Sequence, residues 1–155
     1  MIIEERHRES LSERLVLPAL IKGYGVTLRQ FFKKPFTTFV LTTYAIKPGG
    51  GTYNWRDGVS NDEYREEEAQ FYDLTRYLLK TYRGTGKTFV LQHWEGDWSV
   101  RGSTSRKEED DPTDIPIAGM IRWLEARQTG VERARKEMPD SDVKVYHACE
   151  VNVKY

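Results

Sequence analysis

The sequence predicts an α/β protein in which three parallel strands alternate with two long helices, preceded by an amphipathic helix. Three segments rich in β-branched and aromatic residues begin at Thr37, Lys87 and Val143. The intervals between them each hold a long segment with helical periodicity. Units of this kind form parallel sheets with right-handed crossovers, so the β-α-β-α-β order predicts a partial, TIM-barrel-like sheet.

Residues 1–36 form a part of their own, a charged N-terminus followed by a cationic helix. From Leu15 to Phe36 apolar residues recur at steps of three and four, and no acidic residue occurs. The residues expected to contact a membrane surface are Lys22, Arg29, Lys33, Phe31 and Phe32. This pattern is typical of an ordinary helix packed on a neighbouring domain, and also of a helix that lies on a membrane or docks on a partner.

The second part, residues 37–155, opens with a strand expected at Thr37–Ile46. After a loop rich in glycine, Ser60 or Asn61 is the expected N-cap of a long helix, with Glu63 placed for a capping box. One face of this helix is apolar and consists of Tyr64, Phe71, Leu74, Thr75, Leu78 and Leu79. The segment Tyr82–Gly86 is expected to end it.

A second strand is expected at Lys87–His93 and a charged loop at Ser99–Asp114. The next helix is expected to run from Ile117 to about Glu137. Its apolar face is predicted from steps of four and three and consists of Ile117, Ile121, Leu124, Gln128 and Val131. A third strand is expected at Val143–Val151.

Composition excludes several classes of protein. The 155 residues hold 24 basic and 24 acidic side chains, and residues 1–36 alone hold seven basic and four acidic ones. A chain of zero net charge is not expected to be a dedicated nucleic-acid binder. The single cysteine, Cys149, excludes an internal disulfide and a four-cysteine zinc site, and we expect no metal or cofactor.

The location expected from the sequence is the cytoplasm or the surface of a membrane. No apolar run reaches the length of a transmembrane helix. The N-terminus begins with acidic and basic residues and does not have the pattern of a secretory signal.

Functional side chains of parallel α/β sheets follow the C-terminal ends of strands. The richest group in this chain follows the second strand and consists of His93, Trp94, Glu95, Asp97 and Trp98. Carboxylates beside indoles are typical of a carbohydrate site, because the acids transfer protons and the aromatic faces stack on sugar rings. The third strand adds His147, Glu150 and Asn152.

The predicted catalytic residues are Glu95, Asp97 and Glu150, and the predicted substrate-binding residues are His93, Trp94, Trp98, His147 and Asn152. In an extended chain Glu95 and Asp97 would share a face, about 7 Å apart. Desolvation by Trp94 is expected to raise the pKa of Glu95, as a general acid requires. The same residues are also consistent with helix caps, salt bridges and a tryptophan core, which need no catalytic role.

The segment Gly84–Thr88 contains Gly-Thr-Gly-Lys-Thr, which invites comparison with a phosphate-binding loop. That loop needs a glycine where Thr81 stands and a helix after it, whereas Lys87 opens a predicted strand. The segment is therefore predicted to be a helix end and a turn. The three histidines lack the spacing of metal ligands.

Two stretches near the N-terminus, residues 17–23 and 26–35, resemble the N-terminal helix of the ferredoxin-like subunit I of bacterial NADH-quinone oxidoreductase. In that family the helix lies along the membrane arm and precedes two cysteine-rich motifs that bind iron–sulfur clusters. Neither motif occurs in this sequence. The resemblance therefore implies at most that the helix docks on a membrane surface.

Four segments of the second part, residues 71–75, 87–98, 119–128 and 145–148, resemble poorly characterised glycoside-hydrolase-like proteins with a (β/α)₈ barrel. The resemblance implies a sugar-active barrel without naming the sugar. Glu95 matches the position of a general acid, and the nucleophile is expected on a later strand that these residues do not include.

The expected function is that of a glycoside-hydrolase-like barrel fragment with little or no activity alone. A complete barrel holds about 250 residues and closes with eight strands, whereas three are predicted here. The open sheet edge that results could pair with another copy of the chain. The alternatives are a non-enzymatic protein held on a membrane or respiratory complex by its cationic helix, and a truncated or fused reading frame without selected function.

Overall fold

The computed structural model describes residues 36–52, 55–94, 96–102 and 111–150. The cationic helix expected at residues 15–36 falls outside the described residues except for Phe36. All the other described residues belong to the unit Thr37–Tyr155. None of the helices in the described ranges is long and apolar enough to cross a membrane.

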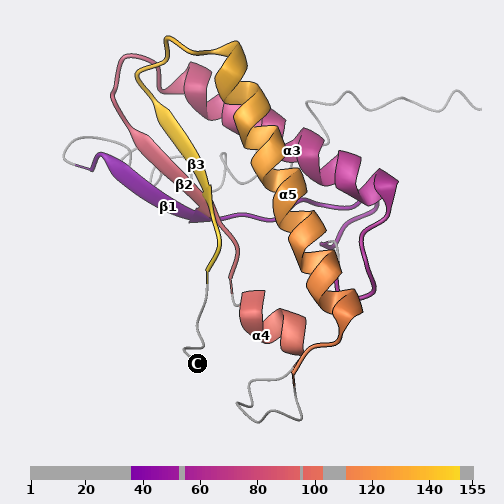
Figure 1. Cartoon of the computed structure of the whole chain (residues 1–155). Helices are drawn as coiled ribbons and strands as arrows, with labels where there is room; N and C mark the ends of the chain where they lie inside the picture. The colour runs from indigo at the N-terminus through magenta and orange to yellow at the C-terminus, as the bar shows by residue number, and fades with distance from the viewer. Residues whose placement is uncertain (1–35, 53–54, 95, 103–110, 151–155) are drawn as a thin grey trace, which may run out of the picture. The chain divides into compact units, whose positions relative to one another are not determined.

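The predicted parallel sheet is confirmed (Figure 1). Its strands are β1 (Thr38–Thr42), β2 (Thr88–Gln92) and β3 (Lys144–Ala148), paired in the order β1-β2-β3. Each strand is shorter than the sequence predicted. After β1, for example, the N–H and C=O of Ile46 bond to the side-chain amide of Gln70, at 2.9 Å each, so the backbone here pairs with a helix rather than with a strand.

The register of the sheet places its side chains in rows that face opposite sides. Phe89 and Leu91 are fully buried and pair with the half-buried Phe39 and Leu41 of β1. These rows face the helices, and burial of each large side chain stabilises the fold by roughly 1.5–3 kcal/mol. The intervening row, Val40–Val90–Tyr146, belongs to the other face, where Val40 and Tyr146 remain exposed.

Both long helices cover the same face of the sheet (Figure 1). Helix α3 spans Asn61–Thr81 and begins with the predicted capping box, in which Ser60 and Glu63 exchange hydrogen bonds. The Ser60 N–H that donates to the Glu63 carboxylate lowers the pKa of that acid. The predicted apolar face is confirmed in its centre, where Phe71, Leu78 and Leu79 are buried.

Helix α5 spans Asp114–Glu137, and the apolar face predicted for it is confirmed at Val131 but wrong in its first half. Ile117 and Ile121 are exposed, and the buried face consists of Gly119, Trp123, Ala126, Arg127, Gly130, Val131 and Ala134. A Cβ on Gly130 would overlap the Glu68 carbonyl of α3. Small residues therefore let the two helices approach closely, and this contact outweighs the burial of the larger isoleucines.

Two connections differ in how well they were predicted. The expected loop after Trp98 is wrong in part, because Gly96–Arg101 forms the short helix α4. The turn at Gly84–Gly86 is confirmed: the N–H groups of Gly84 and Gly86 both donate to the Asp142 carboxylate at 2.7 Å. These bonds lower the pKa of Asp142, and they occupy the amides that a phosphate would need.

Candidate functional site

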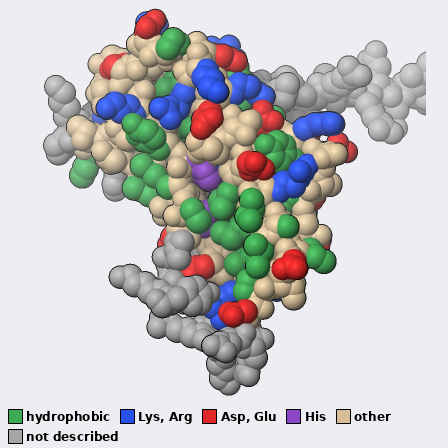
Figure 2. All heavy atoms as spheres, in the orientation of Figure 1, with side chains coloured by type: hydrophobic (Ala, Val, Ile, Leu, Met, Phe, Trp, Pro, Cys, Tyr) green, Lys and Arg blue, Asp and Glu red, His purple; other side chains and the backbone are tan. Residues whose placement is uncertain are grey.

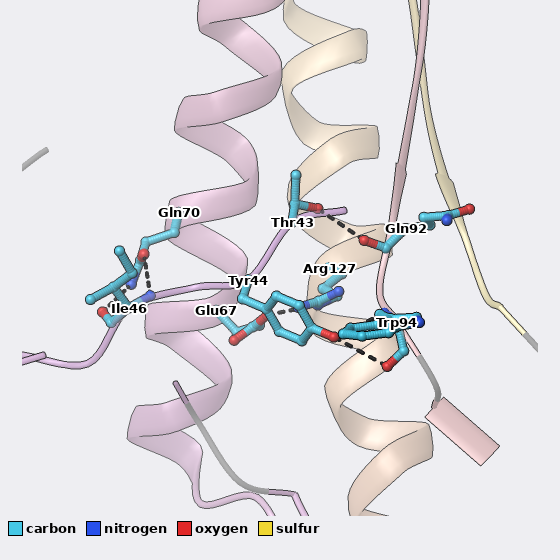
Figure 3. A network of polar contacts seen from close by, with 8 residues as sticks. All are labelled: Thr43, Tyr44, Ile46, Glu67, Gln70, Gln92, Trp94 and Arg127. Carbon is cyan, nitrogen blue, oxygen red and sulfur yellow. Dashed lines mark hydrogen bonds and ion pairs between the residues drawn. The ribbon is translucent and has the colours of Figure 1, made fainter. Parts of the chain in front are cut away.

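The ends of β1 and β2 are joined by an aromatic pair, Tyr44 and Trp94 (Figure 3). The Trp94 N–H donates to the Tyr44 hydroxyl at 2.9 Å, and that hydroxyl donates to the Trp94 carbonyl at 3.1 Å. The neighbouring Thr43 N–H donates to the Gln92 carbonyl at 2.8 Å. The Trp94 side chain is nevertheless 61% exposed, so a fixed backbone holds its indole at the surface.

A buried ion pair lies behind Tyr44 (Figure 3). The Arg127 Nε of α5 donates to the Glu67 Oε1 of α3 at 2.7 Å, and both side chains are at most 2% exposed. The guanidinium lies 3.5 Å from the centre of the Trp123 ring, 4.4 Å from that of Phe71 and 5.6 Å from that of Tyr44. Contacts of a buried cation with aromatic faces contribute about 2 kcal/mol or more each.

Burial shifts the titration of both members of this pair. Desolvation lowers the pKa of Arg127 to about 10, an effect that the Glu67 carboxylate opposes. Desolvation also raises the pKa of Glu67, and Arg127 opposes that shift. The pair is therefore held by mutual attraction against a large cost of desolvation, which makes each partner dependent on the other.

His93 follows β2 and is completely buried. The Glu150 N–H donates to its Nε2 at 3.4 Å, which makes this nitrogen an acceptor and assigns the ring proton to Nδ1. The Cys149 Sγ lies 3.3 Å from the same nitrogen. Gly96 leaves the space for the ring, because a Cβ at that position would overlap it.

The juxtaposition of Cys149 and His93 invites comparison with a catalytic cysteine–histidine pair, but its electrostatics do not favour a nucleophile. Desolvation raises the pKa of Cys149, and the charges of Asp97 and Glu150 raise it further. Desolvation lowers the pKa of His93, and Arg127 adds to that effect. A neutral thiol beside a neutral imidazole is a structural hydrogen bond rather than an activated nucleophile.

His147 belongs to β3 and faces the helices, with its ring edge-on to Phe71 at 6.1 Å. Desolvation lowers the pKa of His147 to about 4, and the positive charge of Arg127 acts in the same direction. Its Nε2 is buried and has no hydrogen-bond partner among the described residues. The two predicted substrate-binding histidines thus belong to the layer between the sheet and the helices.

The structure brings two of the predicted acids to the same end of the sheet. Asp97 lies in the first turn of α4, and Glu150 follows β3. Both carboxylates act on the titration of His93 and Cys149, so both lie close to these two residues. Asp97 is helical rather than extended, and Glu95 falls outside the described residues, so the spacing predicted between the two stays a prediction.

Three of the predicted site residues remain to be located in the structure. Trp98 lies in α4 and is half-buried. Glu95 and Asn152 fall outside the described residues, so their predicted roles stay predictions. Among the described residues of the predicted group, Trp94 is thus the exposed aromatic side chain.

Sequence reasoning missed Glu67 and Arg127, and it did not distinguish Tyr44 from the other residues that follow the first strand. Glu67 precedes Phe71 by one helical turn, and Arg127 follows Trp123 by one turn, so each charge occupies a core-facing position. Opposite charges on the buried faces of two helices that pack together are the signal that could have identified the pair. For Tyr44 the only signal was its place after a strand.

Among the described residues no group of three or more His, Cys, Asp or Glu side chains could hold a metal ion. No family model, curated protein or solved structure matches the chain. Both family resemblances seen in the sequence therefore stay predictions, and function has to be inferred from the geometry of the site.

Proposed function

We propose that the described unit is part of a carbohydrate-active (β/α) barrel, and that its sugar-binding edge is formed by the residues that follow the three strands. The observation that carries this proposal is the exposed Trp94 indole, fixed by reciprocal hydrogen bonds with Tyr44. A rigid aromatic face stacks on the apolar face of a sugar ring at little cost in side-chain entropy.

The surroundings of Trp94 support a polar ligand with several hydroxyl groups. Asp97 and Glu150 lie at the same end of the sheet and supply carboxylates that accept hydrogen bonds from sugar hydroxyls. Glu95, between Trp94 and α4 in sequence, is the proposed general acid. Behind this edge the Glu67–Arg127 pair packs against Tyr44 and so supports the residue that positions Trp94.

The open sides of the unit support its assignment as a barrel segment. The apolar row Val40–Val90–Tyr146 corresponds to the interior of a closed barrel, which side chains from other strands fill. Ile117 and Ile121 are exposed on α5, where a further helix of a barrel would pack. Three strands cannot close a barrel, so we expect sugar binding without efficient hydrolysis.

The test is calorimetric titration of the purified chain with cello-, xylo-, chito- and malto-oligosaccharides. Saturable binding of at least one series is expected, weakened about tenfold or more by Trp94→Ala, since loss of one stacking contact costs about 1.4 kcal/mol or more. Tyr77→Ala is the matched control, because Tyr77 is also exposed but lies on α3. Absence of binding by all four series, or equal effects of the two substitutions, would contradict the proposal.

Hydrolysis is assayed separately with the same sugars. Little or no product is expected, and any trace activity is expected to disappear with Glu95→Gln and to persist with the exposed control Glu66→Gln. Efficient turnover that survives Glu95→Gln would show that the proposed acid is wrong.

A further inference from the structure

A groove of about 530 Å³ lies where α5 ends and β3 begins. It is at the opposite end of the strands from Trp94, since Lys144 is the first residue of β3. Figure 2 shows several Lys and Arg side chains gathered over this upper end. Small-molecule sites in proteins hold about 300–1,000 Å³, so the groove has the size of such a site. The residues that line it are Leu79, Glu132, Arg135, Lys136, Met138, Pro139, Ser141, Val143, Lys144 and Tyr146.

The floor of the groove is apolar and lies below the surface. Leu79 of α3 and Val143, which precedes β3, are 4% exposed or less, so they form the recessed part of the lining. Met138 and Pro139 are more exposed and continue the apolar lining toward solvent. None of these four side chains donates a hydrogen bond, so the floor favours an alkyl chain over a polar group.

Much of the remaining lining is cationic. Arg135, Lys136 and Lys144 are exposed, and none of them forms an ion pair with a residue that the structure describes. The acid of the lining, Glu132, accepts a hydrogen bond from Gln128 at 2.8 Å. Three cations against one acid leave two positive charges in excess on the lining.

Two hydrogen-bond donors of the lining are positioned by contacts within the chain. The Arg135 guanidinium lies 5.1 Å from the centre of the Tyr146 ring, and this contact leaves its N–H groups available for an anion. The Ser141 Oγ accepts a hydrogen bond from the Val143 N–H at 3.3 Å, so its hydroxyl hydrogen can be donated to a ligand. The lining therefore offers an oxyanion a planar guanidinium, ammonium groups and a hydroxyl.

A purely structural role explains only part of this positive charge. Arg135 and Lys136 lie in the last turn of α5, where cations complement the unpaired carbonyl groups of a helix. Lys144 belongs to β3 and has no such role, yet it lines the same groove. Like charges repel each other, so their convergence from two elements favours the binding of an anion among them.

We propose that this groove binds a small phosphate monoester that carries an alkyl chain. The phosphate meets Arg135, Lys136 and Lys144, and the alkyl chain covers Leu79 and Val143. A phosphate monoester has a charge of about −1.5 to −2 at pH 7, which matches the two positive charges in excess. Sugar phosphates and nucleotides would place hydroxyl groups or polar bases against the apolar floor, and a membrane phospholipid would leave its chains in the bilayer.

The test is calorimetric titration of the full chain with hexyl phosphate. Saturable binding is expected, and Arg135→Gln plus Lys144→Gln should weaken it about tenfold or more. The matched control removes the same number of charges from α3, by Arg65→Gln plus Arg76→Gln at two exposed positions. Unchanged thermal unfolding of the groove variant without ligand excludes misfolding as the cause; if it unfolds early, Lys144→Gln alone is compared with Arg76→Gln.

Further probes separate the contribution of the charge from that of the floor. From butyl to hexyl phosphate, each added methylene is expected to tighten binding about threefold, and Met138→Gln should reduce this gain. Hexyl sulfate carries a single negative charge and is expected to bind about fivefold more weakly than hexyl phosphate. Inorganic phosphate lacks the alkyl chain and hexanol lacks the charge, so each is expected to bind at least about tenfold more weakly.

Four results would overturn the proposal: no saturable binding of hexyl phosphate, equal effects of the groove and control variants, an affinity that does not change with chain length, or hexanol that binds as tightly as hexyl phosphate. A membrane surface is tested by sedimentation of the chain with vesicles of phosphatidic acid and phosphatidylcholine. If the groove variant loses vesicle binding while the parent chain does not bind hexyl phosphate, the groove recognises a lipid headgroup and the proposal is wrong.

Discussion

The buried Glu67–Arg127 pair predicts an asymmetry between single and double substitutions. Glu67→Gln leaves the guanidinium of Arg127 in a site with no solvent access. Removal of one partner of such a pair costs about 3–5 kcal/mol, because the remaining charge stays desolvated without compensation. We expect Glu67→Gln to lower the free energy of unfolding by that amount.

Replacement of both partners by apolar residues is expected to cost far less. Glu67→Leu plus Arg127→Met leaves only a small loss of volume and removes both desolvation penalties, so its stability is expected to lie within about 1 kcal/mol of the parent. Arg127 also stacks on Trp123 and Phe71, and methionine retains part of that contact.

The assay is urea unfolding at pH 7 followed by circular dichroism and by tryptophan fluorescence. Arg65→Gln is the control, because it breaks the exposed Arg65–Asp62 pair at 3.3 Å and is expected to cost less than about 0.5 kcal/mol. A Glu67→Gln variant as stable as this control, or a double variant that loses as much as the single one, would refute the reasoning.

Three more outcomes are expected from the described contacts. The pKa of His147 is lowered to about 4, so on acidification the unfolded chain binds a proton at this residue before the folded chain does. The free energy of unfolding should therefore fall by roughly 1–2 kcal/mol between about pH 6.5 and pH 4. In urea unfolding at a series of pH values, His147→Phe should reduce this dependence on pH. Asp142→Asn weakens the two bonds from the turn before β2, so a lower melting temperature is expected in calorimetry, with the difference vanishing in acid, below the lowered pKa of Asp142. Gly130→Ala forces α5 away from α3 and should cost about 1–3 kcal/mol in urea unfolding, whereas Glu125→Ala on the exposed face should cost little.

Most of the fold could be predicted because strands and capped helices have local signals. Segments of β-branched residues located all three strands, and Ser60 with Glu63 identified the start of α3. The buried face of α5 could not be predicted in this way, because hydrophobicity favoured Ile117 and Ile121 while close packing at Gly130 decided the contact. That contact depends on the backbone of another helix, about which a local pattern holds no information.

The candidate site was predicted less completely. Position after a strand identified Trp94 and Glu150, and the parallel topology confirms that these strand ends lie at one edge. The same rule named His93, whose ring lies in the core. The rule identifies a position in the chain but holds no information about the direction of the side chain. Arg127 belongs to a helix, whereas that rule applies to residues that follow strands.

The most direct test of the sugar-binding edge is an NMR titration of the ¹⁵N-labelled chain with the oligosaccharide series that binds most tightly in calorimetry. The sequence holds four tryptophans, so four indole N–H signals are expected, and Trp94→Phe assigns one of them. We expect the Trp94 signal to shift most and the buried Trp123 signal to stay in place. A titration in which the Trp94 signal does not move, while binding is detected elsewhere or not at all, would contradict the proposed function.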